Sequence, residues 1–408
     1  MKPLIDRDAQ LRLTRYFDQI GDVLANKKRR ASFATYAMGL LADGQRKSVE
    51  PIAARACGDP EQTDAVHQRL LHFLSDSPWS DSDVRRVAAE YAVDAMTEDG
   101  PIEAWIVDDT GFLKQGRHSV GVQRQYTGSA GKVTNCQVGV SLSVATRFAH
   151  TPIDFELYLP KTWATDHDRR RIARIPDDVQ FQTKWQLAVG MLRRAREQRV
   201  PKAVVLADSD YGDKVEFRAA VRGLGLHYAV GIHSTARVWH IDALERRRGD
   251  PVSVRDLALQ IGRRGFRRVT WREGAGDTLW SRFAAVRVVS AHDDPLGDPA
   301  IREDVWLLIE WPDGADEPTH YTFATLSRKT SRKQLVRLVK ERYRTEQVYR
   351  ELKTELGLDH FEGRRFPGWH HHVSIALCCY AFLVAERVRH SPPSSRGTGP
   401  HSPLARAA

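Results

Sequence analysis

The stretch "TKWQLAVGMLRRAREQRVPKAVVLADSDYGD", residues 183–213, decides the fold class. Its first half predicts a helix with Thr183 as the N-cap, because a Thr side chain can accept a hydrogen bond from the first helical turn. Its second half predicts a buried strand that runs into Asp208, Asp210 and a turn. Earlier in the chain, "AWIVDDTGF", "TNCQVGVSLSVAT" and "IDFELYLP" predict further strands. Strands, a helix and a strand in this order predict an α/β fold.

The flanking sequence divides the chain into five regions. Three- and four-residue apolar spacing predicts an all-α N-terminal domain over residues 1–98, and we expect this domain to bind DNA. The α/β core occupies residues 99–232, a β-rich insertion follows at 233–330, and residues 331–390 complete the core with one long helix and one apolar helix. Residues 391–408 are rich in Pro, Ser and Gly, which predicts a disordered tail.

The charge of the chain indicates a polyanionic partner. The 408 residues carry a formal charge of +10. Residues 331–408 hold 14 Arg and Lys against 7 Asp and Glu, so +7 of this excess lies in the last fifth of the chain. DNA is the natural ligand of such a surface.

The cysteines and the apolar runs predict a cytoplasmic protein. The four Cys form no CxxC pair, which favours a reducing compartment. The run "VSIALCCYAFLVA" is too short to span a bilayer, and no signal peptide is visible. We therefore expect no membrane partner.

A charged helix is predicted by "RYRTEQVYRELKTELGL", residues 342–358. At about 100° per residue, Arg342, Glu346 and Lys353 fall into one narrow row. An apolar stripe lies beside that row and comprises Val348, Tyr349, Leu352 and Leu356. The row is either a solvated i,i+4 salt bridge between Arg342 and Glu346 or the site of a chemically active carboxylate.

Two acidic strand ends favour the second interpretation. Asp108 and Asp109 end the first strand, and Asp208 and Asp210 follow a later one. Ligands of open α/β sheets bind at the carboxyl ends of strands, although such acids are also common turn residues and helix caps. Together with Glu346 they offer the hard oxygen ligands that suit Mg²⁺, with Mn²⁺ as a substitute. Two such metal ions can assist an in-line displacement at a phosphodiester.

These motifs together resemble insertion-sequence transposases of the DDE superfamily. The resemblance is carried by "WIVDDTGFLKQG", "VGVQRQYTGSAGKVTNCQVGVSLS", "VVLADSDYGD" and the charged helix, and it spans roughly residues 10–388. The most similar group is the insertion-sequence 701 family, a relative of the insertion-sequence 4 group. The resemblance implies an RNase H-like catalytic core with a β-rich insertion before the last acidic helix, in a bacterial, nucleoid-associated protein.

The resemblance also implies roles for single acids. In the wider group the first Asp precedes a Thr, which selects Asp109 over Asp108. The second Asp opens the turn, which selects Asp208 over Asp210. With Glu346 they would form the catalytic, metal-binding triad.

The implied DNA contacts lie on the charged helix. The group's signature is Y-x-x-R-x-x-x-E-x-x-x-x-x-x-K, and Arg342 and Lys353 match its basic positions. Val339 replaces the signature's Tyr, so a contact that depends on that Tyr is not expected. Arg350 is expected to contact DNA as well.

The implied function is DNA transposition. The chain would cleave double-stranded DNA at the element's ends in a Mg²⁺-dependent reaction and join the freed 3′-hydroxyl to target DNA, as a homodimer on the DNA. Two alternatives stay open: a catalytically silent, domesticated copy that binds element ends as a repressor, and a nuclease that cuts without joining.

Overall fold

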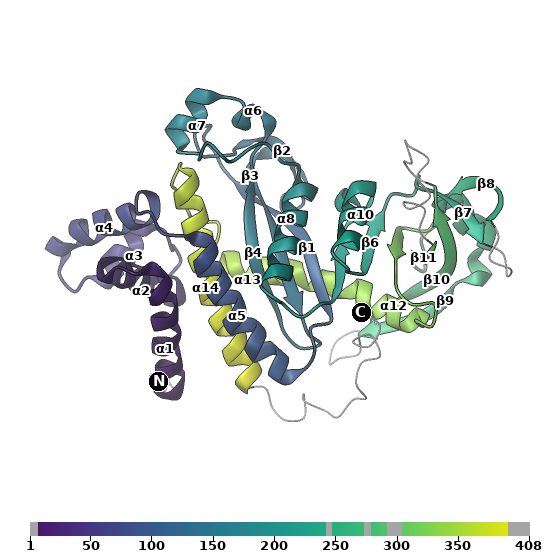
Figure 1. Cartoon of the computed structure of the whole chain (residues 1–408), viewed down its shortest axis with the longest axis horizontal. Helices are drawn as coiled ribbons and strands as arrows, with labels where there is room; N and C mark the ends of the chain where they lie inside the picture. Colours follow the sequence, from purple (N-terminus) through teal and green to yellow (C-terminus); the bar gives the residue numbers. More distant parts are fainter. Residues whose placement is uncertain (1–6, 242–246, 273–278, 292–303, 391–408) are drawn as a thin grey trace.

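The computed structural model describes residues 7–241, 247–272, 279–291 and 304–390 (Figure 1). The expected tail, residues 391–408, lies outside the described residues. The chain begins with a group of helices that matches the periodicity of the first hundred residues. These are α1 (Arg7–Leu24), α2 (Lys27–Leu41), α3 (Val49–Ala56), α4 (Thr63–Ser75) and α5 (Asp81–Asp99).

A mixed β-sheet forms the centre of the molecule. Its first half has the strand order β4-β3-β1-β5-β6, in which β4, β3 and β1 are antiparallel and β1, β5 and β6 are parallel. The predicted α/β class is confirmed. These strands, with β2 paired to the start of β3, are β1 (Ala104–Leu113), β2 (Gln123–Thr127), β3 (Lys132–Ala145), β4 (His150–Tyr158), β5 (Val204–Ala207) and β6 (Tyr228–Ile232).

Short helices connect the core strands. Between β4 and β5 lie α6 (Lys161–Ala164), α7 (His167–Ala173) and α8 (Lys184–Glu197), and between β5 and β6 lie α9 (Ser209–Gly212) and α10 (Val215–Gly223). The predicted N-cap of α8 is confirmed, since Thr183 and Gln186 form a reciprocal capping box. The sequence thus predicted the start of α8 to the residue.

The β-rich region after Ile232 continues the same sheet. Strand β12 pairs antiparallel with β6, and the order then runs β12-β11-β10-β7-β8, with β9 also on β10. The elements of this region are β7 (Arg237–Ile241), β8 (Arg247–Ser253), α11 (Val254–Ile261), β9 (Arg267–Arg272), β10 (Leu279–Ser290), β11 (Asp304–Glu310) and β12 (His320–Ala324). The runs "FRRVTWREG", "LWSRFAAVRVV", "VWLLIEW" and "HYTFATL" predict β9, β10, β11 and β12, whereas β7, β8 and α11 were not predicted.

The expected single long helix after Ser331 is wrong. The structure has α12 (Arg332–Lys340), a 3₁₀ turn over Glu341–Tyr343, and α13 (Arg344–Thr354). A 3₁₀ turn has three residues per turn instead of 3.6, so it changes the phase of the side chains on either side of it. The apolar stripe of α13 is buried as predicted, but Arg342 no longer belongs to the same regular helix as Glu346.

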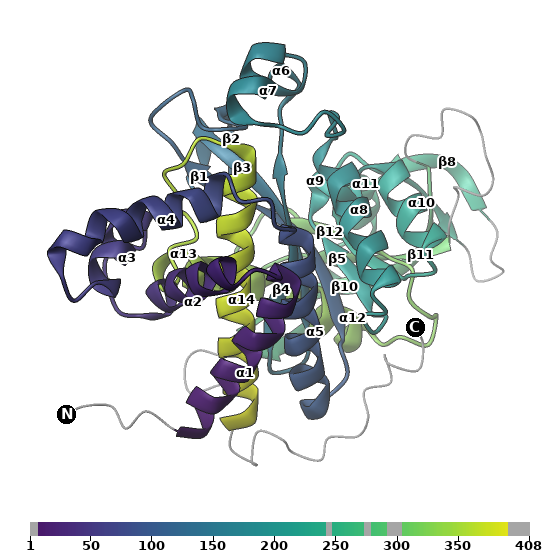
Figure 2. The same ribbon diagram turned by 60° about the vertical axis from the view of Figure 1, so that its left-hand side comes forward.

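The last helix, α14 (Phe366–His390), joins the helical group to the sheet (Figure 2). It packs against α5, α2, α4 and β4 and is buried over most of its length. The side chains of its three consecutive His, residues 370–372, are buried. His371 contacts the backbone carbonyls of Leu74 and Trp79, and His372 contacts the Tyr36 hydroxyl. Among the described helices, none has the length and apolar character needed to cross a membrane.

A buried ionic network fixes the helical group to the sheet. Arg85 of α5 is 4% exposed and contacts Asp81, Asp154 of β4 (Nε–Oδ1 3.0 Å) and Ser374 of α14 (2.8 Å). Arg194 of α8 binds the other Asp154 oxygen at 2.7 Å. Because a buried charge that loses its partner costs several kcal/mol, roughly 3–5, the network constrains how α5, α8 and α14 sit on β4.

Asp81 makes part of the stability dependent on pH. Burial alone would raise the pKa of Asp81, but the Arg85 guanidinium lowers it to about 2. The unfolded value is near 4, so the ionised carboxylate stabilises the fold above about pH 4, and this contribution is lost as the pH falls to about 2. We expect Asp81→Asn to lower the free energy of unfolding at pH 7 by about 2 kcal/mol and to weaken its dependence on pH below 4.

The measurement is urea denaturation of both proteins between pH 2 and pH 7. Asp83→Asn is the matched control, because Asp83 is an exposed acid in the same first turn of α5. Equal pH dependence of wild type and Asp81→Asn would contradict the assignment.

Candidate active site

The register of β1 on β5 places two acids on one face of the sheet. Ala104 pairs with Val204 and Ile106 with Leu206, so Asp108 and Asp208 occupy corresponding positions two residues further on. Side chains alternate between the faces of a strand. The face of Ala104, Ile106, Val204 and Leu206 packs against α12. Asp108 therefore continues a face that is covered by α12 and the segment that follows it.

Arg342, in the 3₁₀ turn between α12 and α13, lies between these carboxylates. Its Nη1 is 2.9 Å from Oδ2 of Asp108 and 4.0 Å from Oδ2 of Asp208. Burial alone would lower the pKa of the Arg342 guanidinium, but Asp108, Asp208 and Glu346 raise it, in that order of influence. Acids from β1, from the end of β5 and from α13 thus act on one cation.

Asp109 points to the opposite face. Its Oδ2 accepts hydrogen bonds from Lys184 Nζ (2.8 Å) at the start of α8 and from the Tyr211 hydroxyl (3.2 Å). Lys184 also contacts Asp210 (3.3 Å), and these acids raise the pKa of Lys184 to about 12 although burial opposes them. Figure 1 shows α8 in front of the sheet and α13 behind it, so the side chains of Asp108 and Asp109 point to opposite faces of the sheet.

The turn after β5 holds Asp208 in place. Asp208 is the N-cap of α9, and its Oδ1 accepts a hydrogen bond from the Asp210 amide at 3.0 Å. Gly212 completes this turn against β6, where an added Cβ would lie 1.9 Å from the Gly231 carbonyl oxygen. Only glycine fits there, which explains the "DYG" of the sequence.

The predicted row on the charged helix is not formed. Arg342 pairs with Asp108 and not with Glu346, and the exposed Glu346 carboxylate makes no hydrogen bond or ion pair within the described residues. Lys353 is half-buried and donates to Thr110 Oγ1 (2.9 Å) and to the Gly111 carbonyl (2.8 Å) of β1. Arg350 is exposed. Of the three predicted DNA contacts, Arg350 is thus the most accessible.

The two strand-end acids lie in an environment that disfavours their negative charge. Burial, together with Asp208 and Asp109, raises the pKa of Asp108 to about 7 although Arg342 opposes the shift. Burial, with Asp210 and Asp109, also raises the pKa of Asp208 against the same guanidinium. Such acids gain stability from additional positive charge.

Within the described ranges, no three acidic, His or Cys side chains already form a metal-binding group. The positive charge between the acids is that of Arg342. The acids nevertheless suit a hard dication, because carboxylate oxygens are the preferred ligands of Mg²⁺. The negative charges of Asp108 and Asp208 are only partly balanced by Arg342.

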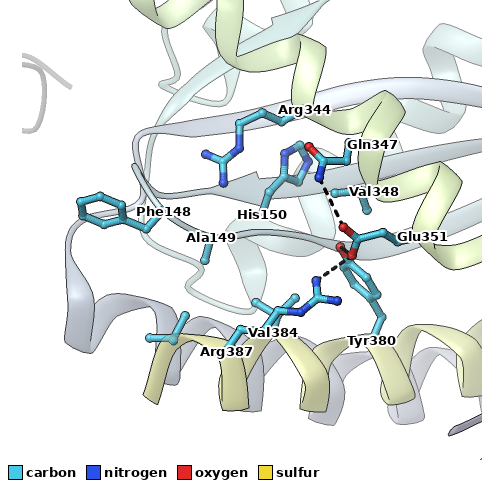
Figure 3. A pocket seen from close by; sticks show the side chains of 11 residues that line it. Phe148, Ala149, His150, Arg344, Gln347, Val348, Glu351, Tyr380, Val384 and Arg387 are labelled. Atoms are coloured by element: carbon cyan, nitrogen blue, oxygen red, sulfur yellow. Dashed lines mark hydrogen bonds and ion pairs between the residues drawn. The ribbon is translucent and has the colours of Figure 1, made fainter. Parts of the chain in front are cut away.

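A separate pocket of about 170 Å³ lies between α13, α14 and the β3–β4 connection. Figure 3 shows Arg387 and Gln347 reaching toward Glu351, which also accepts a hydrogen bond from Tyr380 at 3.1 Å. The buried His150 lines it, and burial beside Arg344 lowers the pKa of His150 to about 3. None of the predicted catalytic acids lines this pocket.

Comparison with known proteins identifies the family. A family model described as "DDE superfamily endonuclease" matches residues 15–278, well over half of the chain. The chain belongs to this family. The predicted superfamily is therefore confirmed. The matched segment contains Asp108, Asp109 and Asp208 but ends before Glu346.

The chain also resembles a curated protein. It is 29% identical over 204 residues to the "Probable transposase for insertion sequence element IS701" of Microchaete diplosiphon. The alignment covers 50% of this chain and 49% of that protein, so the chain matches about half the length of its relative. The similarity agrees with the insertion-sequence 701 group that the motifs indicated.

Two residues of the site escaped the sequence analysis. Lys184 directly follows the correctly predicted cap Thr183, yet nothing in the sequence indicated its contact with Asp109. Tyr211 lies inside the quoted "DSDYGD", and its hydroxyl contacts the same oxygen. The equal spacing of Ala104 to Asp108 and of Val204 to Asp208 is a signal that could have indicated Asp108, but only once the parallel pairing is known.

A substitution of Lys353 tests the contact between α13 and β1. Because its ammonium group satisfies two acceptors of β1 while half-buried, we expect Lys353→Met to lower the free energy of unfolding by about 2 kcal/mol. Arg350→Met is the control on the same helix. Arg350 is exposed and its side chain makes no hydrogen bond or ion pair with a described residue, so its loss should change stability by less than about 0.5 kcal/mol. Equal stability of the two variants in urea titrations would contradict the contact with β1.

Proposed function

We propose that this DDE endonuclease is the transposase of an insertion sequence, which cleaves DNA at the element's ends and transfers the strand to target DNA. One observation carries the proposal: the Arg342 guanidinium lies 2.9 Å from Asp108 of β1 and 4.0 Å from Asp208 at the end of β5, and Glu346 follows on α13. Two acids held beside one guanidinium at the carboxyl ends of parallel strands, with a third acid on the helix that follows, are typical of a site for phosphoryl chemistry. Membership of the endonuclease family and the resemblance to a probable transposase support it.

The topology supports an RNase H-like core for this site. Three antiparallel strands followed by two parallel ones, with α8 on one face and the α12–α13 segment on the other, form the first half of the sheet. The β-rich region enters between β6 and α12 and returns through β12 beside β6. In this proposal the insertion leaves the catalytic strands uninterrupted, and the helical group α1–α5 binds DNA.

Mg²⁺ is the proposed cofactor, with Asp108, Asp208 and Glu346 as the residues that would hold it. The geometry favours Asp108 over the Asp109 that the resemblance implies, because Asp108 shares Arg342 with Asp208 while Asp109 faces α8. When bound, the metal would activate an oxygen nucleophile and stabilise the charge that develops on phosphorus.

The chain's own residues prepare this site. Arg342 holds Asp108 next to Asp208 and partly balances their charge. Lys184 and Tyr211 fix Asp109 on the other face. Lys353 secures α13 to β1, which sets the distance of Glu346 from the strand ends. Arg350 remains available for a DNA phosphate, and we propose that a homodimer forms on the DNA.

The first test is cleavage of duplex DNA that carries an element end. Asp108→Asn, Asp208→Asn and Glu346→Gln should each reduce cleavage by at least a hundredfold, because each removes a charged metal ligand. DNA affinity should change less than threefold, since these acids contact no phosphate directly. Asp210→Asn, an exposed acid in the same turn as Asp208, is the control and should keep most of the activity.

The cleavage activities of Asp108→Asn and Asp109→Asn show which of the two acids belongs to the triad. If Asp109→Asn abolishes cleavage and Asp108→Asn does not, the residue implied by the resemblance is the ligand and the geometric choice is wrong. Joining of a pre-cleaved end to plasmid DNA separates a transposase from a nuclease that only cuts. An intact protein that binds ends but neither cuts nor joins them would instead be the repressor.

A further inference from the structure

A basic surface lies at the end of the sheet where β2 and the segment after β1 meet α6 and α7. An open cleft of about 540 Å³ lies there. Both views of the fold place α6 and α7 beside the ends of β2 and β3 (Figures 1 and 2). Three guanidinium groups from separate segments line the cleft: Arg117 after β1, Arg124 on β2 and Arg169 on α7.

Two of the three cations of this cleft lack compensating charge. Arg117 and Arg124 are exposed, and neither side chain makes a hydrogen bond or an ion pair with any described residue. Asp166 is the only acid in the lining, and it pairs with Arg169 at 3.6 Å. Arg169 also lies over the Trp163 ring, 4.9 Å from its centre, which orients the guanidinium. The structure thus holds at least two cations ready for an external anion.

The strand register sets the distance from the cleft to the catalytic acids. Arg124 pairs with Asn135 on β3, and Asp108 pairs with Ser141 on the same strand. Six residues of a strand span roughly 20 Å. Along a DNA duplex, roughly 20 Å corresponds to about six base pairs at 3.4 Å each. The cleft therefore lies about half a turn of DNA from the proposed point of cleavage.

We propose that this cleft binds the phosphate backbone of the duplex that flanks the cleavage point. The inference rests on the proposed function, because it assigns a further DNA contact to the same site. Unpaired Arg side chains on one wall, with a single acid that is already paired, are complementary to a row of phosphates. Tyr126, one of the most exposed aromatic side chains at 63%, lies two residues from Arg124 on the same strand and extends this surface.

The first experiment measures affinity for a duplex with an element end at several salt concentrations, without Mg²⁺. For the double variant Arg117→Ala/Arg124→Ala we expect the slope of log affinity against log salt to fall by about 2, or about 0.9 per lost phosphate contact. Arg171→Ala/Arg174→Ala is the control. Both residues are exposed cations of the same lobe that already contact acids and do not line the cleft.

Equal slopes for the two double variants would overturn the inference. A second arm separates DNA from a free anion: inorganic phosphate at millimolar concentration should not compete with the duplex. If it competes with wild type and not with Arg117→Ala/Arg124→Ala, the cleft is a site for a small anion and the inference fails.

The second experiment locates the cleft on the DNA. An iron chelate attached to Arg124→Cys, in a protein whose own four Cys are replaced, should cut the duplex within about six base pairs of the cleavage position. Cuts only at distant positions would overturn the placement. If wild type binds no DNA at all, the proposed function itself fails. If wild type binds and cleaves while these variants behave like their control, only the cleft assignment fails.

Discussion

The carboxylates at the ends of β1 and β5 need a positive charge beside them. Asp108 is 8% exposed, and burial raises its pKa to about 7, so its ionised form depends on the Arg342 guanidinium 2.9 Å away. A buried carboxylate without such a partner costs several kcal/mol or stays protonated. The site is therefore balanced between two cations: the guanidinium that the chain supplies and the dication that, in our account, binds the same acids.

Several contacts elsewhere in the structure hold the charged groups of this site in position. The 3₁₀ turn before α13 turns Arg342 toward the sheet, and Lys353 ties the same helix to β1 eleven residues later. On the opposite face, Lys184 neutralises Asp109, so the two neighbouring acids of β1 do not compete for one cation. The Arg85 network then fixes α5, α8 and α14 on β4, which is separated from β1 by β3.

Local patterns in the sequence were sufficient to predict the helices and strands, but not to predict which face of the sheet each acid occupies. The Thr183 cap, the strands that end in acids and the apolar stripe of α13 all depend on neighbouring residues, and all were predictable. Strand β1 is buried on both faces, so its side chains do not alternate between apolar and polar, and the sequence could not tell which face Asp108 shares. The 3₁₀ break at Arg342 has no Gly or Pro to mark it and follows from contacts with distant strands.

The most direct test of the central claim maps where a dication binds along the chain. Fe²⁺ placed in a Mg²⁺ site generates radicals that cut the nearby backbone, and the fragments can be sequenced. The account predicts cuts near residues 108–110, 208–210 and 342–346, all suppressed together by excess Mg²⁺ and all lost in Asp208→Asn. Cuts confined to other segments, or cuts at only one of the three that Mg²⁺ does not suppress, would contradict the convergence of these acids on one metal site.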